Sequence, residues 1–162
     1  MSILRELVDD AIVETPERPS VLKPYVMSHG TLEVRNLKKS RKFFEEFLGL
    51  EVVVHSPSSF VIRLGLKFFI VAVEVGDALH PAQLLNHWGL DMASKEEVDE
   101  AYRKAVELKD EWGIAEIKEP IARHGVYSFY LRDLDSNWWE IQYYPGFIHD
   151  DLFDFGDRYE LS

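Results

Sequence analysis

One order of predicted elements occurs twice in this chain, and that repetition constrains the fold more than any other feature. A shift of 58 positions places His29 on His87 and Leu32 on Leu90. In each half, a strand of alternating polar and apolar residues is followed by a helix with an apolar stripe and then by three more strands. The pattern predicts two βαβββ modules.

The predicted elements fall at corresponding places in the two halves. In the first half, we expect strands at 28–35, 50–55, 59–64 and 67–75, with a helix that starts after Asn36 and ends at Gly49. In the second, we expect strands at 87–92, 114–118, 127–131 and 138–144, with a helix that starts at a Ser94–Glu97 capping box and ends at Gly113. A polar turn at 133–137 joins the last two strands.

This element order predicts an α+β fold with one domain at 27–145, made of modules at about 27–76 and 85–145. Each helix would bury one face of its sheet. The other faces would curl into an open barrel-like sheet with polar residues inside and the helices outside. Residues 1–26 form a predicted N-terminal extension, and residues 146–162 form a C-terminal tail.

Both ends of the chain are unusually apolar for flexible segments. In the extension, five apolar residues share one face of a predicted short helix: Leu4, Leu7, Val8, Ala11 and Ile12. The tail contains Phe147, Phe153, Phe155 and Tyr159, which is atypical of disorder. We therefore expect the tail to pack on the barrel mouth or on a partner, and the chain to form a homodimer.

Charge and composition exclude several classes of partner. The net charge is −11, so the chain lacks the basic surface that nucleic acids or anionic membranes require. No run of 18 apolar residues predicts a transmembrane helix, and the start of the chain does not have the apolar core of a signal peptide. There is no cysteine, which excludes disulfides and thiolate ligands. We expect a cytoplasmic protein that binds a small molecule.

Three side chains predict a metal site. His29 and His87 begin equivalent strands, on the side that faces away from the helices, and Glu140 lies in the middle of the last strand. A lone histidine is more often a hydrogen-bonded structural residue, and a lone glutamate on a strand is more often a surface residue. Two imidazoles and one carboxylate on converging strands would instead form a facial triad. Such a triad suits iron(II), with manganese(II) or zinc(II) as alternatives.

The chain resembles the vicinal oxygen chelate superfamily from about residue 28 to residue 145. The motifs that carry the resemblance are Met27-Ser-His-Gly-Thr-Leu-Glu-Val, Asn86-His-Trp-Gly-Leu-Asp-Met and Tyr130-Leu-Arg-Asp-Leu-Asp-Ser-Asn-Trp-Trp-Glu. The family includes glyoxalases, fosfomycin-modifying enzymes, drug-sequestering proteins and extradiol dioxygenases. The resemblance implies that His29, His87 and Glu140 are the metal ligands, held within one chain or shared between two subunits.

Within the superfamily, the last strands are similar to those of extradiol dioxygenases. Tyr130 precedes Glu140 by ten residues, and His124 lies six residues further upstream. The resemblance implies that His124 moves protons and that Tyr130 hydrogen-bonds the substrate, a small catechol. Residues 67–75 contain no histidine where the dioxygenases have one. A glyoxalase-like lyase, a fosfomycin-type thiol transferase and a non-enzymatic drug-binding protein therefore remain alternatives.

Overall fold

A computed structural model describes residues 19–24, 26–146, 152–154 and 156–161, and it contains two sheets. The first sheet has the order β1-β4-β3-β2, with β1 at His29–Val34, β2 at Glu51–Ser56, β3 at Ser59–Arg63 and β4 at Phe69–Glu74. β1 and β4 are parallel, and the other neighbours are antiparallel. The helical segments of this half are α2 (Leu37–Lys42), η1 (Phe43–Phe47) and the short η2 (Gly76–Ala78).

The second sheet repeats this arrangement in the order β5-β9-β8-β6. Its strands are β5 (His87–Asp91), β6 (Glu116–Ile117), β8 (Val126–Arg132) and β9 (Trp138–Tyr143), and β7 (Ile121–Arg123) also pairs with β8. β5 and β9 are parallel, as β1 and β4 are. The helix of this half is α3 (Lys95–Glu107), capped by Ser94 as predicted. The predicted α+β fold of two βαβββ modules is therefore confirmed.

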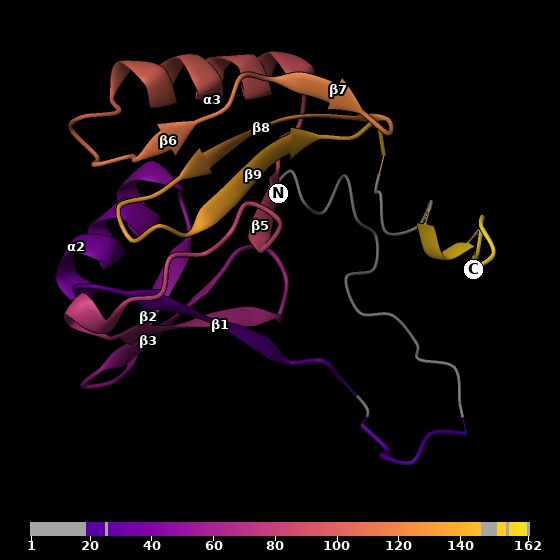
Figure 1. The fold of residues 1–162 in the computed structure, drawn as a ribbon, viewed down its shortest axis with the longest axis horizontal. Coiled ribbons are helices and arrows are strands. Elements are labelled where there is room, and N and C mark those ends of the chain that lie inside the picture. The colour runs from indigo at the N-terminus through magenta and orange to yellow at the C-terminus, as the bar shows by residue number, and fades with distance from the viewer. Residues whose placement is uncertain (1–18, 25, 147–151, 155, 162) are drawn as a thin grey trace.

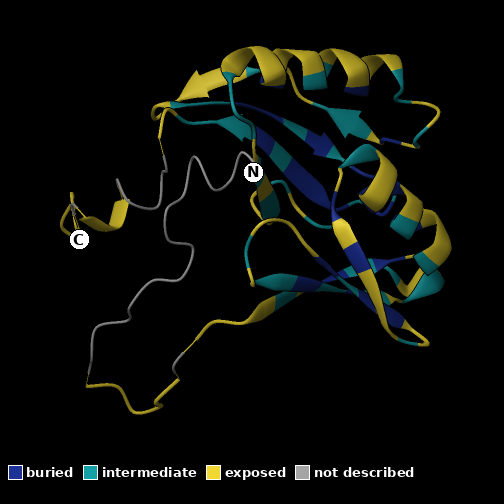
Figure 2. Ribbon diagram, turned by 180° about the vertical axis from the view of Figure 1, so that it is seen from behind, coloured by how far each residue is buried: buried dark blue, intermediate teal, exposed yellow. Residues whose placement is uncertain are grey.

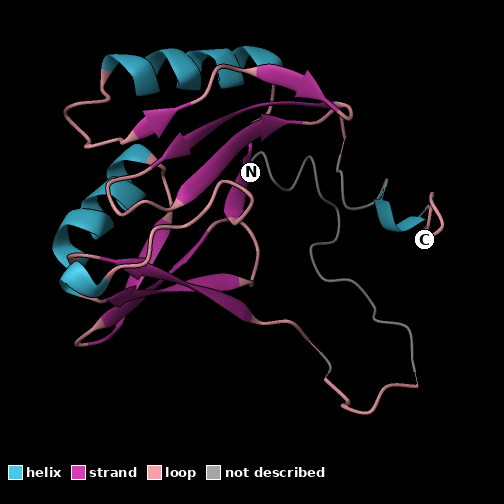
Figure 3. Ribbon diagram, viewed as in Figure 1, coloured by secondary structure: helices cyan, strands magenta, loops and turns pink. Residues whose placement is uncertain are grey.

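The helices lie outside the two open sheets, and α3 runs above the second sheet against β8 and β9 (Figures 1 and 3). Phe44 of η1 joins the two halves, because its ring lies 5.8 Å from Phe60 of the first sheet and 5.6 Å from Trp139 of the second. The sheets also approach each other at Gly30, where a Cβ atom would lie 2.4 Å from the ring of Trp88. Figure 2 shows buried residues concentrated in the sheets, while the outer side of α3 is exposed.

The first helix differs from the single α-helix that the sequence predicts. After α2 the chain widens into the π-helix η1, where the backbone N–H of Leu48 donates to the carbonyl of Phe43 at 3.1 Å. The wider turn allows the adjacent residues Phe43 and Phe44 both to be buried. Gly49 ends the helix with a φ of +74°, as predicted.

The strand predicted at 114–118 is shorter in the structure, and a second strand, β7, follows it. Pro120 lies between β6 and β7. Because proline has no backbone N–H and restricts the backbone, it separates the two short strands. The pattern of apolar residues gave no signal for β7, whose three residues are all exposed.

The structure does not test the roles that the sequence predicts for the two ends of the chain. The apolar stripe at Leu4–Ile12 lies outside the described residues. In the tail, a short helical turn covers residues 152–154, and Leu152, Phe153 and Tyr159 keep more than half of their surface exposed. Packing of these ends on a second copy stays a prediction. In the part of the chain that the structure describes, no helix is long and apolar enough to cross a membrane.

Candidate metal centre

The parallel strands β5 and β9 bring together two of the three predicted ligands, His87 and Glu140. Their register places Gly89 opposite Glu140, with His87 on the same face of β5 two residues earlier. Nε2 of His87 lies 3.1 Å from Oε2 of Glu140.

The tautomer of His87 determines what must lie between its Nε2 and Oε2 of Glu140. Nδ1 of His87 lies 2.8 Å from the carbonyl oxygen of Leu84. A carbonyl oxygen only accepts hydrogen bonds, so Nδ1 carries a proton, and Nε2 of the neutral ring presents a lone pair. That lone pair faces Oε2 of Glu140, which is also an acceptor. The pair therefore needs a cation between its two atoms, either a proton on Nε2 or a metal ion.

Two hydroxyl groups hold the other oxygen of Glu140. Ser128 Oγ donates to Oε1 at 2.7 Å, and the hydroxyl of Tyr130 donates to the same atom at 2.8 Å. Burial and the hydrogen bond to Glu140 raise the pKa of Tyr130 to about 12. Tyr130 therefore remains a neutral donor at physiological pH. These contacts fix the carboxylate so that Oε2 stays directed at His87.

The geometry of this pair fits a shared divalent ion. Two ligands at adjacent corners of an octahedron, each about 2.1 Å from a metal ion, lie about 3.0 Å apart, whereas two ligands of a tetrahedral ion lie about 3.4 Å apart. The separation of 3.1 Å between Nε2 and Oε2 agrees with the octahedral value. An imidazole nitrogen and a carboxylate oxygen suit iron(II), manganese(II) or zinc(II). Among the described residues, however, no group of three His, Asp or Glu side chains is placed to hold an ion.

The third predicted ligand, His29, lies on the other sheet. It begins β1, is exposed, and its ring stacks on Phe69 with centroids 5.3 Å apart. Its Nδ1 lies 2.7 Å from Oγ of Ser28. A single chain thus brings His87 and Glu140 together without His29, so the three-ligand site stays a prediction.

A groove of about 490 Å³ lies between β1 and β5, and His87 lines it whereas Glu140 does not. Thr31 and Glu33 line it from the first sheet, and His87 lines it from the second. Glu33 accepts hydrogen bonds from the backbone N–H of His80 at 2.6 Å and from its ring Nδ1 at 3.0 Å. These bonds hold the pKa of Glu33 below its usual range. The groove offers space for a small substrate next to the candidate ligand.

The predicted proton shuttle, His124, lies away from this pair. It occupies the exposed turn between β7 and β8, with a φ of +52°. Val126, the first residue of β8, is four residues from Tyr130, which corresponds to about 13 Å along a strand. His124 lies beyond Val126, so the chain does not bring it to Glu140. Its role in proton transfer stays a prediction.

Sequence reasoning did not single out Ser128 or the buried carboxylates of the β8–β9 turn. A signal for Ser128 was present, because the alternation that puts Tyr130 on the face of Glu140 puts Ser128 there as well. For the turn, the sequence predicted only its bend. In the structure, Asp133 and Asp135 are almost completely buried there.

Asp133 organises the turn that precedes β9. Its Oδ1 accepts from the backbone N–H groups of Asp135 and Asn137 at 2.8 and 3.0 Å, and its Oδ2 accepts from Nε1 of Trp139 at 2.8 Å. Burial raises the pKa of Asp133 to about 7, although these hydrogen bonds oppose the shift. Because Trp139 is the residue before Glu140, the turn helps to set the position of the candidate ligand.

Asp135 ties the same turn to the first module. Its carboxylate accepts from the backbone N–H of Arg35 at 2.8 Å and from Oγ of Ser40 at 2.5 Å. The guanidinium of Arg35 in turn donates to the carbonyl of Leu134 at 2.8 Å. These contacts connect residues about 100 positions apart, and they fix the position of the β8–β9 turn relative to α2.

Comparison with known proteins agrees with the fold described above. The sequence profile of the Glyoxalase/Bleomycin resistance protein/Dioxygenase superfamily matches residues 26–141, and the chain belongs to that superfamily. No curated protein matches the chain. The superfamily includes enzymes as well as binding proteins, so membership by itself does not fix the reaction.

Solved structures with the same fold include two with named activities or roles. The fosfomycin resistance protein FosX from Listeria monocytogenes is 28% identical, with a TM-score of 0.61, over 80% of this chain and 100% of FosX. Lactoylglutathione lyase from Agrobacterium tumefaciens is 23% identical, with a TM-score of 0.56, over 75% of this chain and 95% of the lyase. The second similarity shows the fold alone.

Proposed function

We propose that the chain is a metal-dependent enzyme in which His87 and Glu140 of one copy and His29 of a second copy hold one divalent ion. The observation that carries the proposal is the His87–Glu140 pair, whose facing acceptor atoms need a cation between them. Three protein ligands on one face leave three positions for substrates. Iron(II) is the ion we expect, with manganese(II) or zinc(II) as alternatives.

A two-fold symmetric homodimer would supply the third ligand. β1 and β5 are edge strands of their sheets, so each has one edge that pairs with no other described strand. His29 is exposed on the first of these edges. In a symmetric pair, His29 of each copy would complete the site of the other, which gives two equal sites.

For the reaction, we propose extradiol ring cleavage of a small catechol. Bound iron(II) would supply the redox chemistry that allows O2 to react with the ring. Tyr130 holds its proton, which its hydroxyl donates to Oε1 of Glu140 in this structure. In the proposed reaction the hydroxyl would turn from Oε1 to donate that proton to a substrate oxygen. By its spacing from Tyr130 in the sequence, we assign His124 the movement of protons during ring opening. This role requires the β7–β8 turn to come closer to Glu140 than it lies in this structure.

The charges around the site favour a neutral phenol over a dianion. Lys118 is ion-paired with Glu116, and the guanidinium of Arg132 lies 3.6 Å from the same carboxylate. Both cations also lie over the ring of Trp138, although Nε of Arg132 is a buried donor without a hydrogen-bond partner among the described residues. The net charge of −11 further disfavours the approach of a dianion.

A second candidate is a fosfomycin-type thiol transferase. The similarity to FosX, which is above 25% identity and spans all of that chain, favours this candidate. The glyoxalase-like lyase and the non-enzymatic binding protein have support only at the level of the fold and the superfamily.

Metal analysis and substrate assays separate these functions. Protein purified without oxygen is analysed for iron, manganese and zinc, and the loaded protein is then assayed for O2 uptake with a panel of catechols. A parallel assay follows the loss of fosfomycin with and without thiols. O2 uptake supports the dioxygenase, and loss of fosfomycin supports the second candidate. A chain that binds no divalent metal would contradict both.

Mixing two inactive variants tests whether the site is shared. His29→Ala and Glu140→Ala are each expected to bind no metal. If the site spans two copies, equal mixing and exchange of subunits should restore about a quarter of the sites, because half of the dimers are mixed and one of their two sites is intact. A site within one chain would give no recovery. Val71→Ala keeps all three predicted ligands and serves as the reference for full occupancy.

A further inference from the structure

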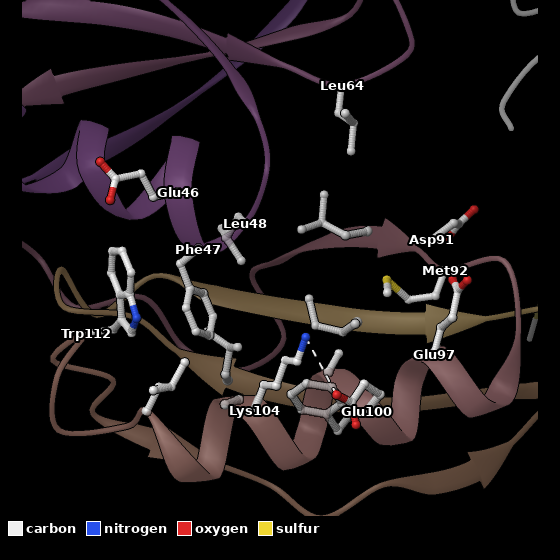
Figure 4. A pocket seen from close by; sticks show the side chains of 17 residues that line it. Glu46, Phe47, Leu48, Leu64, Asp91, Met92, Glu97, Glu100, Lys104 and Trp112 are labelled. Atoms are coloured by element: carbon white, nitrogen blue, oxygen red, sulfur yellow. Dashed lines mark ion pairs between the residues drawn. The ribbon is translucent and has the colours of Figure 1, made fainter. Parts of the chain in front are cut away.

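A second cavity lies on the opposite face of the second sheet from His87 and Glu140. It measures about 460 Å³, which is within the range of small-molecule sites. Phe129, Leu131 and Ile141 line it from β8 and β9, and residues of η1 and α3 complete it (Figure 4). The superfamily comparison and the proposed metal site leave this cavity without a role.

Small residues on α3 keep the cavity open. Ala101 and Ala105 lie one turn apart on the face of α3 that lines it. A longer apolar side chain at either position would enter the cavity. At the other side, Leu64 follows β3 and is 54% exposed, although it lines the same space. The cavity thus offers apolar surface that the chain itself leaves uncovered.

The rim of the cavity is acidic. Glu46, Asp91, Glu97 and Glu100 line it, and Lys104 is the single cation among its lining residues. The ammonium of Lys104 lies 3.6 Å from Glu100, so it is already neutralised. Figure 4 shows Asp91 and Glu97 at one end, Glu46 at the other and the Lys104–Glu100 pair between them. Among the described residues, Glu46, Asp91 and Glu97 form no ion pair.

We propose that this cavity binds a hydrophobic amine. The hydrocarbon part of the ligand lies on the apolar floor of β8 and β9, where removal from water favours binding. The protonated nitrogen stays at the rim and interacts with the carboxylate of Glu46 at one end of the cavity. The acidic residues of the rim repel an apolar anion of equal size, so charge complementarity selects the amine. This inference is independent of the proposed metal chemistry.

The test uses the full-length protein and three eight-carbon probes: octylamine, octan-1-ol and octanoate. Calorimetry gives the affinities, and backbone amide shifts in NMR spectra locate the binding. We expect octylamine to bind at least about tenfold more tightly than octanoate, with octanol between them. The shifts should map to α3 and η1, and the fluorescence of Trp112, which lines the cavity, should change.

Two variants and a matched control identify the cavity as the site. Ala101→Leu fills the space and should weaken octylamine binding at least about tenfold. Val106→Leu enlarges an exposed residue of the same helix, and it should leave the affinity unchanged. Glu46→Gln should weaken the amine several-fold but leave octanol unaffected, which separates the charge from the hydrocarbon contacts.

Several outcomes would overturn the proposal. One is the absence of saturable octylamine binding to the full-length protein, and another is equal affinity for octanoate. Shifts confined to Tyr130 and Glu140 would place the amine at the metal face instead. Retained binding in Ala101→Leu would exclude this cavity. A change of oligomeric state in that variant would show that the cavity is an interface between copies.

Discussion

The two modules have the same architecture, but only the second carries a carboxylate on its last strand at the central position. In the first module, the parallel register of β1 and β4 places Val71 opposite Thr31. In the second, the same register of β5 and β9 places Glu140 opposite Gly89. Both modules begin their first strand with a histidine. The proposed three-ligand site would therefore need one module of each kind, with His29 from a first module and His87 and Glu140 from a second.

The turns before the last strands differ as well. In the first module, residues 64–68 join β3 to β4, and Leu64 is exposed there. In the second, the β8–β9 turn is held by the buried carboxylates of Asp133 and Asp135. The stronger hydrogen-bond network occurs in the module that carries Glu140. This difference suggests that the position of β9, which carries Glu140, is held more precisely than the position of β4, the equivalent strand of the first module.

The largest expected effect is loss of the metal. His87→Ala or Glu140→Ala should lower metal affinity by more than about 100-fold, because loss of an outer partner alone costs about 10–100-fold. Val71→Ala, at the equivalent position of the first module, should retain the metal. Metal content after dialysis against a weak chelator measures both. Full occupancy in Glu140→Ala would remove that residue from the site.

Next in size is the loss of stability when the turn is broken. Asp133→Ala leaves three donors without their acceptor, including Nε1 of Trp139. We expect the free energy of unfolding to decrease by more than about 3 kcal/mol, because each unsatisfied buried group costs about 1–3 kcal/mol. Leu64→Ala, in the other turn, should cost less than about 1 kcal/mol. Urea denaturation measures the free energy of unfolding of both variants. Equal losses of stability would contradict the difference assigned to the two turns.

The raised pKa of Asp133 predicts a pH dependence of stability. In the unfolded chain this carboxyl titrates near its ordinary value of 3.8, and in the folded chain it titrates at about 7. Between these values the folded state binds more protons, so stability from this group is present at low pH and decreases as the pH rises through 7. Asp133→Asn cannot titrate and should flatten this part of the curve. Thermal unfolding between pH 4 and 8 measures the slope, and an unchanged slope in Asp133→Asn would reject the assignment.

A smaller effect is expected from the hydroxyl groups that hold Glu140. Tyr130→Phe removes one hydrogen bond to Oε1 and should lower metal affinity about tenfold. Tyr127→Phe, on the same strand, removes a hydroxyl that donates to Asp99 instead, and it should leave the affinity unchanged. Competition with a metal-sensitive dye measures both. Equal affinities of the two variants would show that Tyr130 does not support the site.

The smallest effect on metal binding and stability is expected at His124. His124→Asn keeps a residue that tolerates positive φ, so stability should change by less than about 0.5 kcal/mol and the metal should remain. Under the proposed ring cleavage, turnover of catechol should nevertheless fall by about 10²–10⁴, the usual contribution of an acid or base group. Unchanged turnover would remove His124 from the mechanism and would leave the metal site intact.

Much of the fold could be predicted because its signals are local. The repeat of element order predicted both modules, and Ser94 and Gly49 marked helix ends through capping and positive φ. Strand alternation alone places Tyr130 and Glu140 on one face. By the same rule Ser128 could have been assigned to that face. The short strand β7 and the π-helix η1 could not be predicted, since pairing and packing outside the local sequence decide them.

The sequence by itself determined which residue types stand at equivalent places in the two modules, because alternation and capping depend on near neighbours. Only the tertiary structure decided that His87 and Glu140 meet at 3.1 Å, since strands more than 40 residues apart in the chain must first pair in register. It also decided that Asp133 is a buried acceptor rather than an ordinary turn residue. Burial depends on Trp139 and on packing across the modules, and no local pattern in the sequence encodes it.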